Sequence, residues 1–147
     1  MSQGITNPAE PFFKDGQWGW DGTLWRKLPM VWGYSDRYFE DLGGTQENGG
    51  TYSAYGTEVP PGEVWVIQSM RLTNITGARG YINFYAYAGA ASHVLYYRKT
   101  PAVGEYDFWE GAVALKAGDK VRVIQASCLD DDVLYGSVWG YKMKVAE

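Results

Sequence analysis

Few residues in this sequence could act as a nucleophile, a base or a metal ligand. His93 is the single histidine of the 147 residues, which rules out zinc and catalytic sites that need two imidazoles. A hydrolytic site would also need a nucleophile and an orienting acid beside His93. Ser92 precedes His93, but neighbouring strand residues point to opposite faces, and no Gly-x-Ser-x-Gly motif occurs. We therefore interpret His93 as a strand or surface residue.

Two groups of carboxylates are the remaining chemical candidates. Glu105, Asp107 and Glu110 are close enough in sequence to suggest the acid pair of a glycosidase, but Asp107 stands between two aromatic residues and is expected to face solvent. The three aspartates at 130–132 offer oxygen ligands to calcium, yet they lack the spaced Asp-x-Asp-x-Asp-Gly pattern. We interpret them as a solvated loop. The sequence thus predicts no catalytic residue, no cofactor and no metal, in a protein that is not an enzyme.

Aromatic side chains make up 16% of the chain, and many lie in its first 40 residues, beside two Asp-Gly turn signals at 15–16 and 21–22. Aromatic rings bury a large area with few rotatable bonds, so they suit interfaces. We expect this segment to be a docking arm that inserts between neighbouring subunits, or a cover that folds back on its own β domain. The predicted partner-binding anchors are Phe12, Phe13, Trp18, Trp20, Trp25 and Trp32.

The same arm allows a second interpretation, which is carbohydrate binding. Trp and Tyr faces stack on sugar rings, and Asp and Asn side chains bond to hydroxyl groups. Strings such as Asp-Gly-x-Trp occur in choline-binding repeats, but those repeats recur at a fixed period and the string occurs once here. We therefore reject the choline-binding family and keep a glycan as a candidate partner.

Charge and composition exclude several other classes of partner. The net charge is −4, and no Lys/Arg run is longer than two residues, which argues against nucleic acid. No window reaches the roughly 18 consecutive apolar residues of a membrane helix. The first residues lack the charged and apolar regions of a secretory signal. Cys128 is the single cysteine, so we expect it to be buried and the protein to fold in a reducing cytoplasm.

The second part of the chain alternates between apolar and polar residues as strands do. Turn signals at 59–62, 88–91 and 116–119 separate its strands. The first predicted strand has an imperfect pattern that indicates a bulge near Gln68 and Ser69. In the last strand, an apolar face runs from Val133 through Tyr135 and Trp139 to Val145. Strands are predicted over 63–75, 81–88, 93–98, 106–109, 112–115, 120–126 and 133–145.

Seven or eight short strands with a turn every 8–12 residues favour an all-β fold, a single antiparallel β-sandwich of jelly-roll type. The composition shift near residue 50 divides the chain into an extended aromatic-rich N-terminal arm over 1–50 and a β-sandwich domain over 51–147. Residues 42–50 read as a polar link between the two.

Three motifs of the second part resemble a jelly-roll module of accessory proteins in tailed bacteriophages. These are a Pro-Gly turn into a long strand at 59–67, a Leu-x-x-Gly-Asp turn at 115–119, and a closing strand with Gly-Tyr at 140–141. The block at 11–36 is also similar to phage virion proteins. The resemblance implies a homotrimer on the head, a fibre or the tail, assembled in the host cytoplasm and located in the virion. Capsid or tail proteins would be its partners.

The function that we expect is therefore a non-enzymatic virion structural protein: a capsid decoration or cement protein, a fibre base or a tail accessory protein. It would dock on its neighbours through the aromatic arm. The alternative is a carbohydrate-binding β-sandwich module that recognises a cell-surface glycan. Surplus tyrosines on the predicted strands, more than a thin core can hide, are compatible with the trimer interface (Tyr81, Tyr85, Tyr87, Tyr96 and Tyr97).

Overall fold

The computed structural model describes residues 18–20, 25–27, 31–77, 80–99 and 103–145, and for 18–20, 25–27 and 31–35 it describes the backbone alone. All regular elements in these residues are strands. Two short strands pair as an antiparallel hairpin, with Trp20 opposite Trp25. The strands are β1 (Trp18–Trp20), β2 (Trp25–Lys27), β3 (Val31–Asp41), β4 (Gly44–Gln46), β5 (Gly50–Tyr55), β6 (Glu63–Asn74), β7 (Tyr81–Ala88), β8 (Ala91–Lys99), β9 (Asp107–Lys116), β10 (Lys120–Cys128) and β11 (Asp132–Val145).

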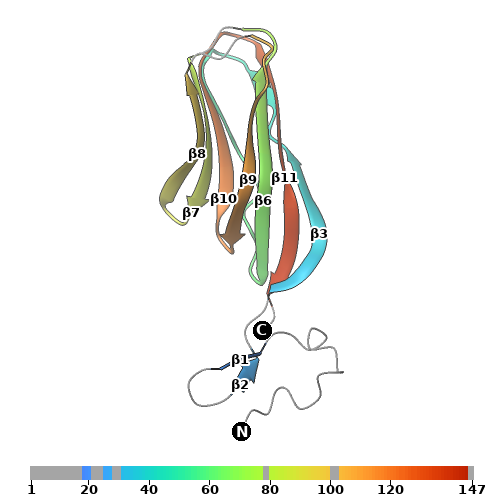
Figure 1. Cartoon of the computed structure of the whole chain (residues 1–147). Helices are drawn as coiled ribbons and strands as arrows, with labels where there is room; N and C mark the ends of the chain where they lie inside the picture. Colours follow the sequence, from blue (N-terminus) through green and yellow to red (C-terminus); the bar gives the residue numbers. More distant parts are fainter. Residues whose placement is uncertain (1–17, 21–24, 28–30, 78–79, 100–102, 146–147) are drawn as a thin grey trace.

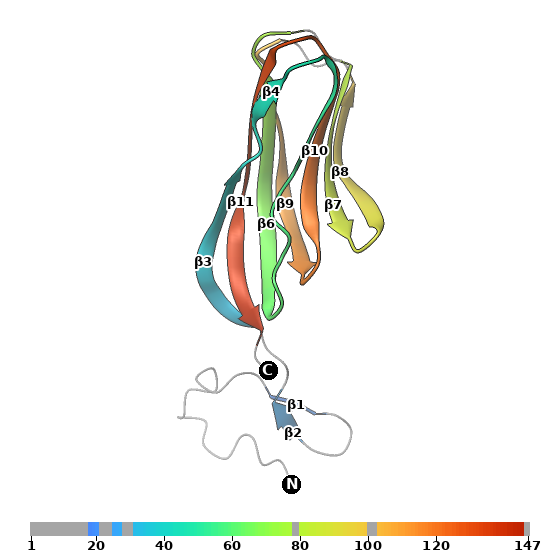
Figure 2. The same ribbon diagram turned by 180° about the vertical axis from the view of Figure 1, so that it is seen from behind.

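Two antiparallel sheets pack face to face as a sandwich (Figures 1 and 2). One has the order β3-β11-β6-β9, with β4 pairing to β11, and the other has the order β5-β10-β7-β8. Apart from the β7–β8 hairpin, consecutive long strands alternate between the sheets. Eight strands in this order form a jelly roll. The all-β sandwich that the turn spacing predicts is confirmed.

Tight turns join the strands where the sequence predicts them. β9 ends at Lys116 and β10 begins at Lys120. Within this turn Gly118 has a φ of +87°, a conformation that favours glycine. The Asp119 carboxylate accepts a hydrogen bond from the Lys116 amide at 3.0 Å and fixes the turn. The Leu-x-x-Gly-Asp motif is thus a structural signal.

A bulge interrupts the pairing in the middle of β6. The register of β6 against β9 shifts between Ile67 and Ser69, and β11 shifts at the same level. The extra residue is Gln68, so the bulge that the imperfect pattern predicts is confirmed. β9 runs through this level as one strand, although the sequence suggested two pieces around Glu110.

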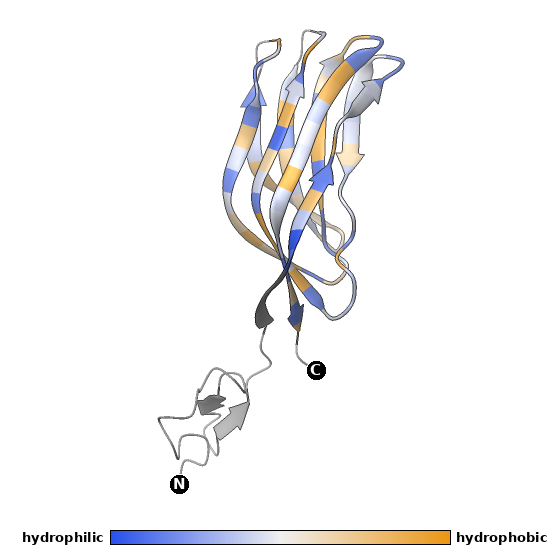
Figure 3. Ribbon diagram, turned by 90° about the vertical axis from the view of Figure 1, so that its right-hand side faces the viewer, coloured by the Kyte–Doolittle hydropathy of each residue, from blue (hydrophilic) through white to orange (hydrophobic). Residues whose placement is uncertain are grey.

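The core lies between the sheets and contains side chains from both. Hydrophilic and hydrophobic residues alternate along the strands (Figure 3). Its largest fully buried members include Phe84, Ile67, Met70 and Leu72. Cys128 is 4% exposed in this core, as expected for a small apolar side chain.

Part of the range that the sequence assigned to an arm lies in the sandwich. β3 pairs with β11 from Val31 to Asp41, and β4 pairs with β11 inside the segment expected to be a polar link. Leu42 is 2% exposed. The high Gly and aromatic content of 31–50 hid this strand pairing, because its apolar residues follow no clean alternation. The sandwich therefore includes β3 and β4, which the sequence placed in the arm.

Candidate functional site

The residues with catalytic potential do not meet in one place. His93 lies on β8 and is exposed. Asp107 is 1% exposed rather than solvent-facing, because it shares the inward face of β9 with Leu115, while Phe108 points outward. Its carboxylate accepts hydrogen bonds from Tyr96 Oη at 2.8 Å and Arg98 Nη1 at 3.2 Å. Arg98 also pairs with Glu105 at 2.8 Å. These groups tie β8 to the start of β9.

The Asp107 cluster is a structural ion pair. Burial, followed by the hydrogen bond to Asp107, raises the pKa of Tyr96. The ring of Tyr96 stacks on Phe84 with centroids 5.2 Å apart. Glu110, the third carboxylate of the suggested glycosidase group, is exposed on the opposite face of β9. The three acids therefore do not flank a common space.

The acidic loop at 130–132 divides into two roles. Asp130 and Asp131 are exposed, as a solvated loop requires, but Asp132 is 2% exposed. Its carboxylate accepts hydrogen bonds from Asn74 Nδ2 at 2.7 Å, Thr76 Oγ1 at 3.0 Å and the Leu129 amide at 2.7 Å. Asp132 therefore joins two loops. Within the described residues no group of three or more His, Cys, Asp or Glu side chains is placed to hold a metal.

The predicted anchors of the arm fall largely outside the described side chains. Phe12 and Phe13 lie outside the described residues. Trp18, Trp20 and Trp25 belong to the β1–β2 hairpin, and Trp32 pairs with Lys144 on β11 through the backbone. The arm remains a prediction.

Tyrosines gather instead on the outer surface of the β5-β10-β7-β8 sheet. Tyr97 is 56% exposed and Tyr81 is 37% exposed, with their ring centroids 6.0 Å apart. Tyr96 points to the core, so four of the five surplus tyrosines of the sequence lie on this surface together with Tyr55. We call this surface the tyrosine face, made of Tyr55, Tyr81, Tyr85, Tyr87 and Tyr97.

Hydrogen bonds hold part of the tyrosine face rigid. Arg122 on β10 lies 4.8 Å from the Tyr55 ring centroid and donates to Tyr87 Oη at 2.9 Å and to Ser53 Oγ at 2.8 Å. Asn83 donates to Tyr85 Oη at 2.7 Å. Rings fixed in this way lose little conformational freedom when a partner covers them.

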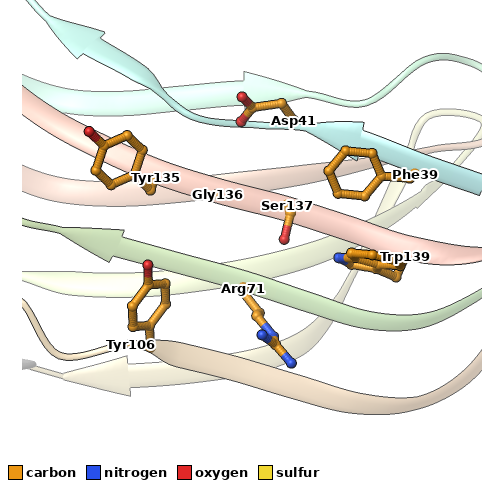
Figure 4. A pocket seen from close by; sticks show the side chains of 8 residues that line it. All are labelled: Phe39, Asp41, Arg71, Tyr106, Tyr135, Gly136, Ser137 and Trp139. Carbon is orange, nitrogen blue, oxygen red and sulfur yellow. The ribbon is translucent and has the colours of Figure 1, made fainter.

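A second surface lies on the outer side of the other sheet, where a hollow of about 440 Å³ opens. Its residues come from β3, β6, β11 and the residue that precedes β9. We call it the Arg71 depression (Figure 4). Phe39 and Trp139 lie at one end with ring centroids 4.7 Å apart, and Tyr135 and Tyr106 lie at the other end.

Polar groups lie between the two aromatic ends of the depression. Arg71 and Ser137 are register partners across β6 and β11, and Asp41 is opposite Ser137 on β3. An adjoining hollow of about 330 Å³ shares Arg71 and extends to Glu110. The arrangement combines exposed ring faces with one cation and two carboxylates, which can stack on, donate to and accept from a bound molecule.

No motif in the sequence points to this depression. Its signal was present in β11, where Tyr135 and Trp139 share the predicted apolar face. That face turns outward at these two residues, while Leu134 and Val138, each directly before one of them, are buried. A strand with apolar residues on both faces has more apolar side chains than the core can accept, so one of its faces lies at the surface.

The comparisons with known proteins give distant structural likenesses. No protein-family model matches the chain, and no curated protein matches its sequence. The structure of infectious bursal disease virus strain Gx is similar with 8% identity and a TM-score of 0.32, over 77% of this chain and 37% of that one. A mutant VP2 protein of the same virus, in derived T=1 particles, has 9% identity and a TM-score of 0.35.

The Gt strain of this virus gives 13% identity and a TM-score of 0.34. The VP2 mutant and the Gt strain are each matched over 86% of this chain and 35% of the viral chain. The chain therefore spans about a third of the length of these viral proteins. No helix in the described residues is long and apolar enough to cross a membrane.

Proposed function

We propose that this protein is a non-enzymatic structural protein of a tailed-phage virion, of the decoration, fibre-base or tail accessory kind. Subunits associate into a homotrimer through the tyrosine face of the jelly roll. The aromatic arm over the first 30 residues attaches the trimer to a capsid or tail protein. The resemblance of the turn and strand motifs to phage jelly-roll modules supports the virion setting.

The tyrosine face is the observation that carries this proposal. Tyr55, Tyr81 and Tyr97 are 48%, 37% and 56% exposed on one paired sheet, and Val94 beside them is 58% exposed. Soluble monomers rarely leave a large contiguous apolar patch uncovered. Tyrosine and arginine are enriched in the buried centres of interfaces, and Arg122 lies among these rings.

Solution mass tests the proposal. We expect size-exclusion chromatography with light scattering to give three times the 16.5 kDa of the chain. Replacing Tyr81 and Tyr97 together with serine should shift the protein to the monomer. Tyr106→Ser is the matched control, because Tyr106 has the same 56% exposure as Tyr97 but directly precedes β9 of the other sheet. Circular dichroism checks that each variant keeps its β structure.

Two outcomes contradict the proposal. A monomeric wild type at all concentrations removes the trimer, and a folded Tyr81/Tyr97 variant of unchanged mass removes the tyrosine face from the interface. The same preparations test attachment by co-sedimentation with phage particles that lack the protein. Trp20→Ala combined with Trp25→Ala should keep the trimer and lower its occupancy on the particles, and full occupancy argues against the arm.

A further inference from the structure

The Arg71 depression lies on the opposite sheet from the tyrosine face, so it is free for a separate role. Exposed aromatic rings frame it: Phe39 is 53% exposed, Trp139 40%, Tyr135 53% and Tyr106 56%. A patch formed only of such rings would suit an apolar partner. This patch differs because charged groups occupy its middle (Figure 4).

Arg71 is the central polar group, and its guanidinium has hydrogen-bond donors available for a ligand. Its guanidinium carries five N–H donors. It is exposed, and across the part of the chain that the structure describes no hydrogen bond or ion pair occupies it. The two hollows of this face both include Arg71, so a molecule in either one meets these donors.

The acceptors lie on both sides of Arg71. The Asp41 Oδ1 atom accepts the Gly43 amide at 2.8 Å, which orients the carboxylate and leaves Oδ2 for a ligand. Glu110 lines the adjoining hollow. Ser137 adds a hydroxyl that both donates and accepts. Across the depression and the adjoining hollow, one cation and two carboxylates give a net charge of −1, and the whole chain carries −4.

We propose that the Arg71 depression binds a short neutral oligosaccharide. The apolar C–H face of a sugar ring stacks on Trp139 or Tyr135, whose side chains lie about 13 Å apart along one strand at about 3.3 Å per residue. Sugar hydroxyls donate to Asp41 and Glu110 and accept from Arg71. The negative balance of the two hollows together disfavours sugars that carry carboxylate or sulfate groups.

Two features separate this site from a protein interface. The floor alternates donors and acceptors within one hollow, which matches a ring of hydroxyl groups that both donate and accept. The aromatic rings stand at the ends of the hollow rather than in a continuous apolar patch, so the molecule between them must be polar at its edges and apolar on its face.

Isothermal titration of the full chain tests the site with defined probes. The neutral probes are cellohexaose, maltohexaose and chitohexaose, and the acidic probes are oligogalacturonate and sialyllactose. We expect saturable binding of at least one neutral probe. Arg71→Gln and Trp139→Ala should each weaken that binding about tenfold or more, the loss that follows removal of a charge-assisted hydrogen bond or a ring contact.

Ile75→Ala is the control, because its side chain is 44% exposed, close to the 40% of Trp139, but lines neither hollow and lies outside the tyrosine face, so the affinity should stay unchanged. Arg71→Gln keeps the test decisive if Trp139→Ala fails to fold, since residue 71 is exposed. The absence of binding to all neutral probes, binding of acidic probes alone, or a neutral-probe affinity that Arg71→Gln leaves intact would each overturn the proposal. The subunit mass is a separate measurement and does not depend on these results.

Discussion

Adjacent residues of this chain have opposite roles because strand side chains alternate between faces. Tyr96 stacks on Phe84 in the core, while Tyr97 is 56% exposed on the tyrosine face. Asp107 is buried against Arg98, while Phe108 is 55% exposed. From residue type alone, Phe108 would be expected in the core and Asp107 at the surface. Asp107 can be buried because Tyr96 and Arg98 donate hydrogen bonds to its carboxylate.

Asp132 gives a prediction at the scale of one residue. Asp132→Ala should lower the free energy of unfolding by about 2–4 kcal/mol, because the Asn74 amide, the Thr76 hydroxyl and the Leu129 amide all lose their acceptor. Urea denaturation followed by tryptophan fluorescence measures the change. The exposed neighbour variant Asp130→Ala should stay within about 0.5 kcal/mol of the wild type. Equal effects of the two variants would show that Asp132 does not hold the loops together.

At the scale of elements, β11 is a central strand of its sheet. It pairs with β3 and β4 on one side and with β6 on the other. The bulge at Gln68 lets β6 stay paired with β11 along its length, and the register of this pair changes where Gly140 is opposite Ile67. The backbone of β6 comes very close to β11 at this point. Only a residue without a side chain fits there.

Gly140→Ala tests that close approach. A Cβ atom at this position would meet the carbonyl oxygen of Val66, which is backbone and cannot rotate away. We expect a loss of about 3 kcal/mol or more in the free energy of unfolding, through forced separation of the two strands. Thermal unfolding measures it, with Lys144→Ala on the same strand as a control that changes little. A Gly140→Ala protein as stable as that control would rule out the tight pairing.

The whole molecule is a thin sandwich whose two outer faces both carry aromatic side chains. Its core holds buried tyrosines as well, and burial raises the pKa of Tyr38, Tyr52 and Tyr96 above the ordinary value of about 10. Hydrogen bonds to Glu40 and Asp107 add to the effect for Tyr38 and Tyr96. The folded protein therefore keeps these phenols protonated when the unfolded chain has released its protons.

The sign of the pH dependence follows from this difference. The contribution of the tyrosines is complete below the unfolded pKa of about 10 and is lost as the pH rises from there through the higher folded pKa. We expect the urea midpoint to fall above about pH 10 and to fall less steeply in Tyr38→Phe. Tyr97→Phe, whose ring is exposed, should follow the wild-type curve. A wild-type midpoint that stays level across this alkaline range would contradict the prediction.

The sequence alone determined the all-β class, the turns at 59–62, 88–91 and 116–119, the bulge near Gln68 and the burial of Cys128. These features depend on local chemistry, namely alternation, glycine and proline placement, and side-chain size. The tertiary structure decided that β3 and β4 join the sandwich, that Asp107 and Asp132 are buried, and that Arg71 lies between two aromatic groups. Those facts depend on which strands become neighbours, and strand pairing joins residues far apart in the chain.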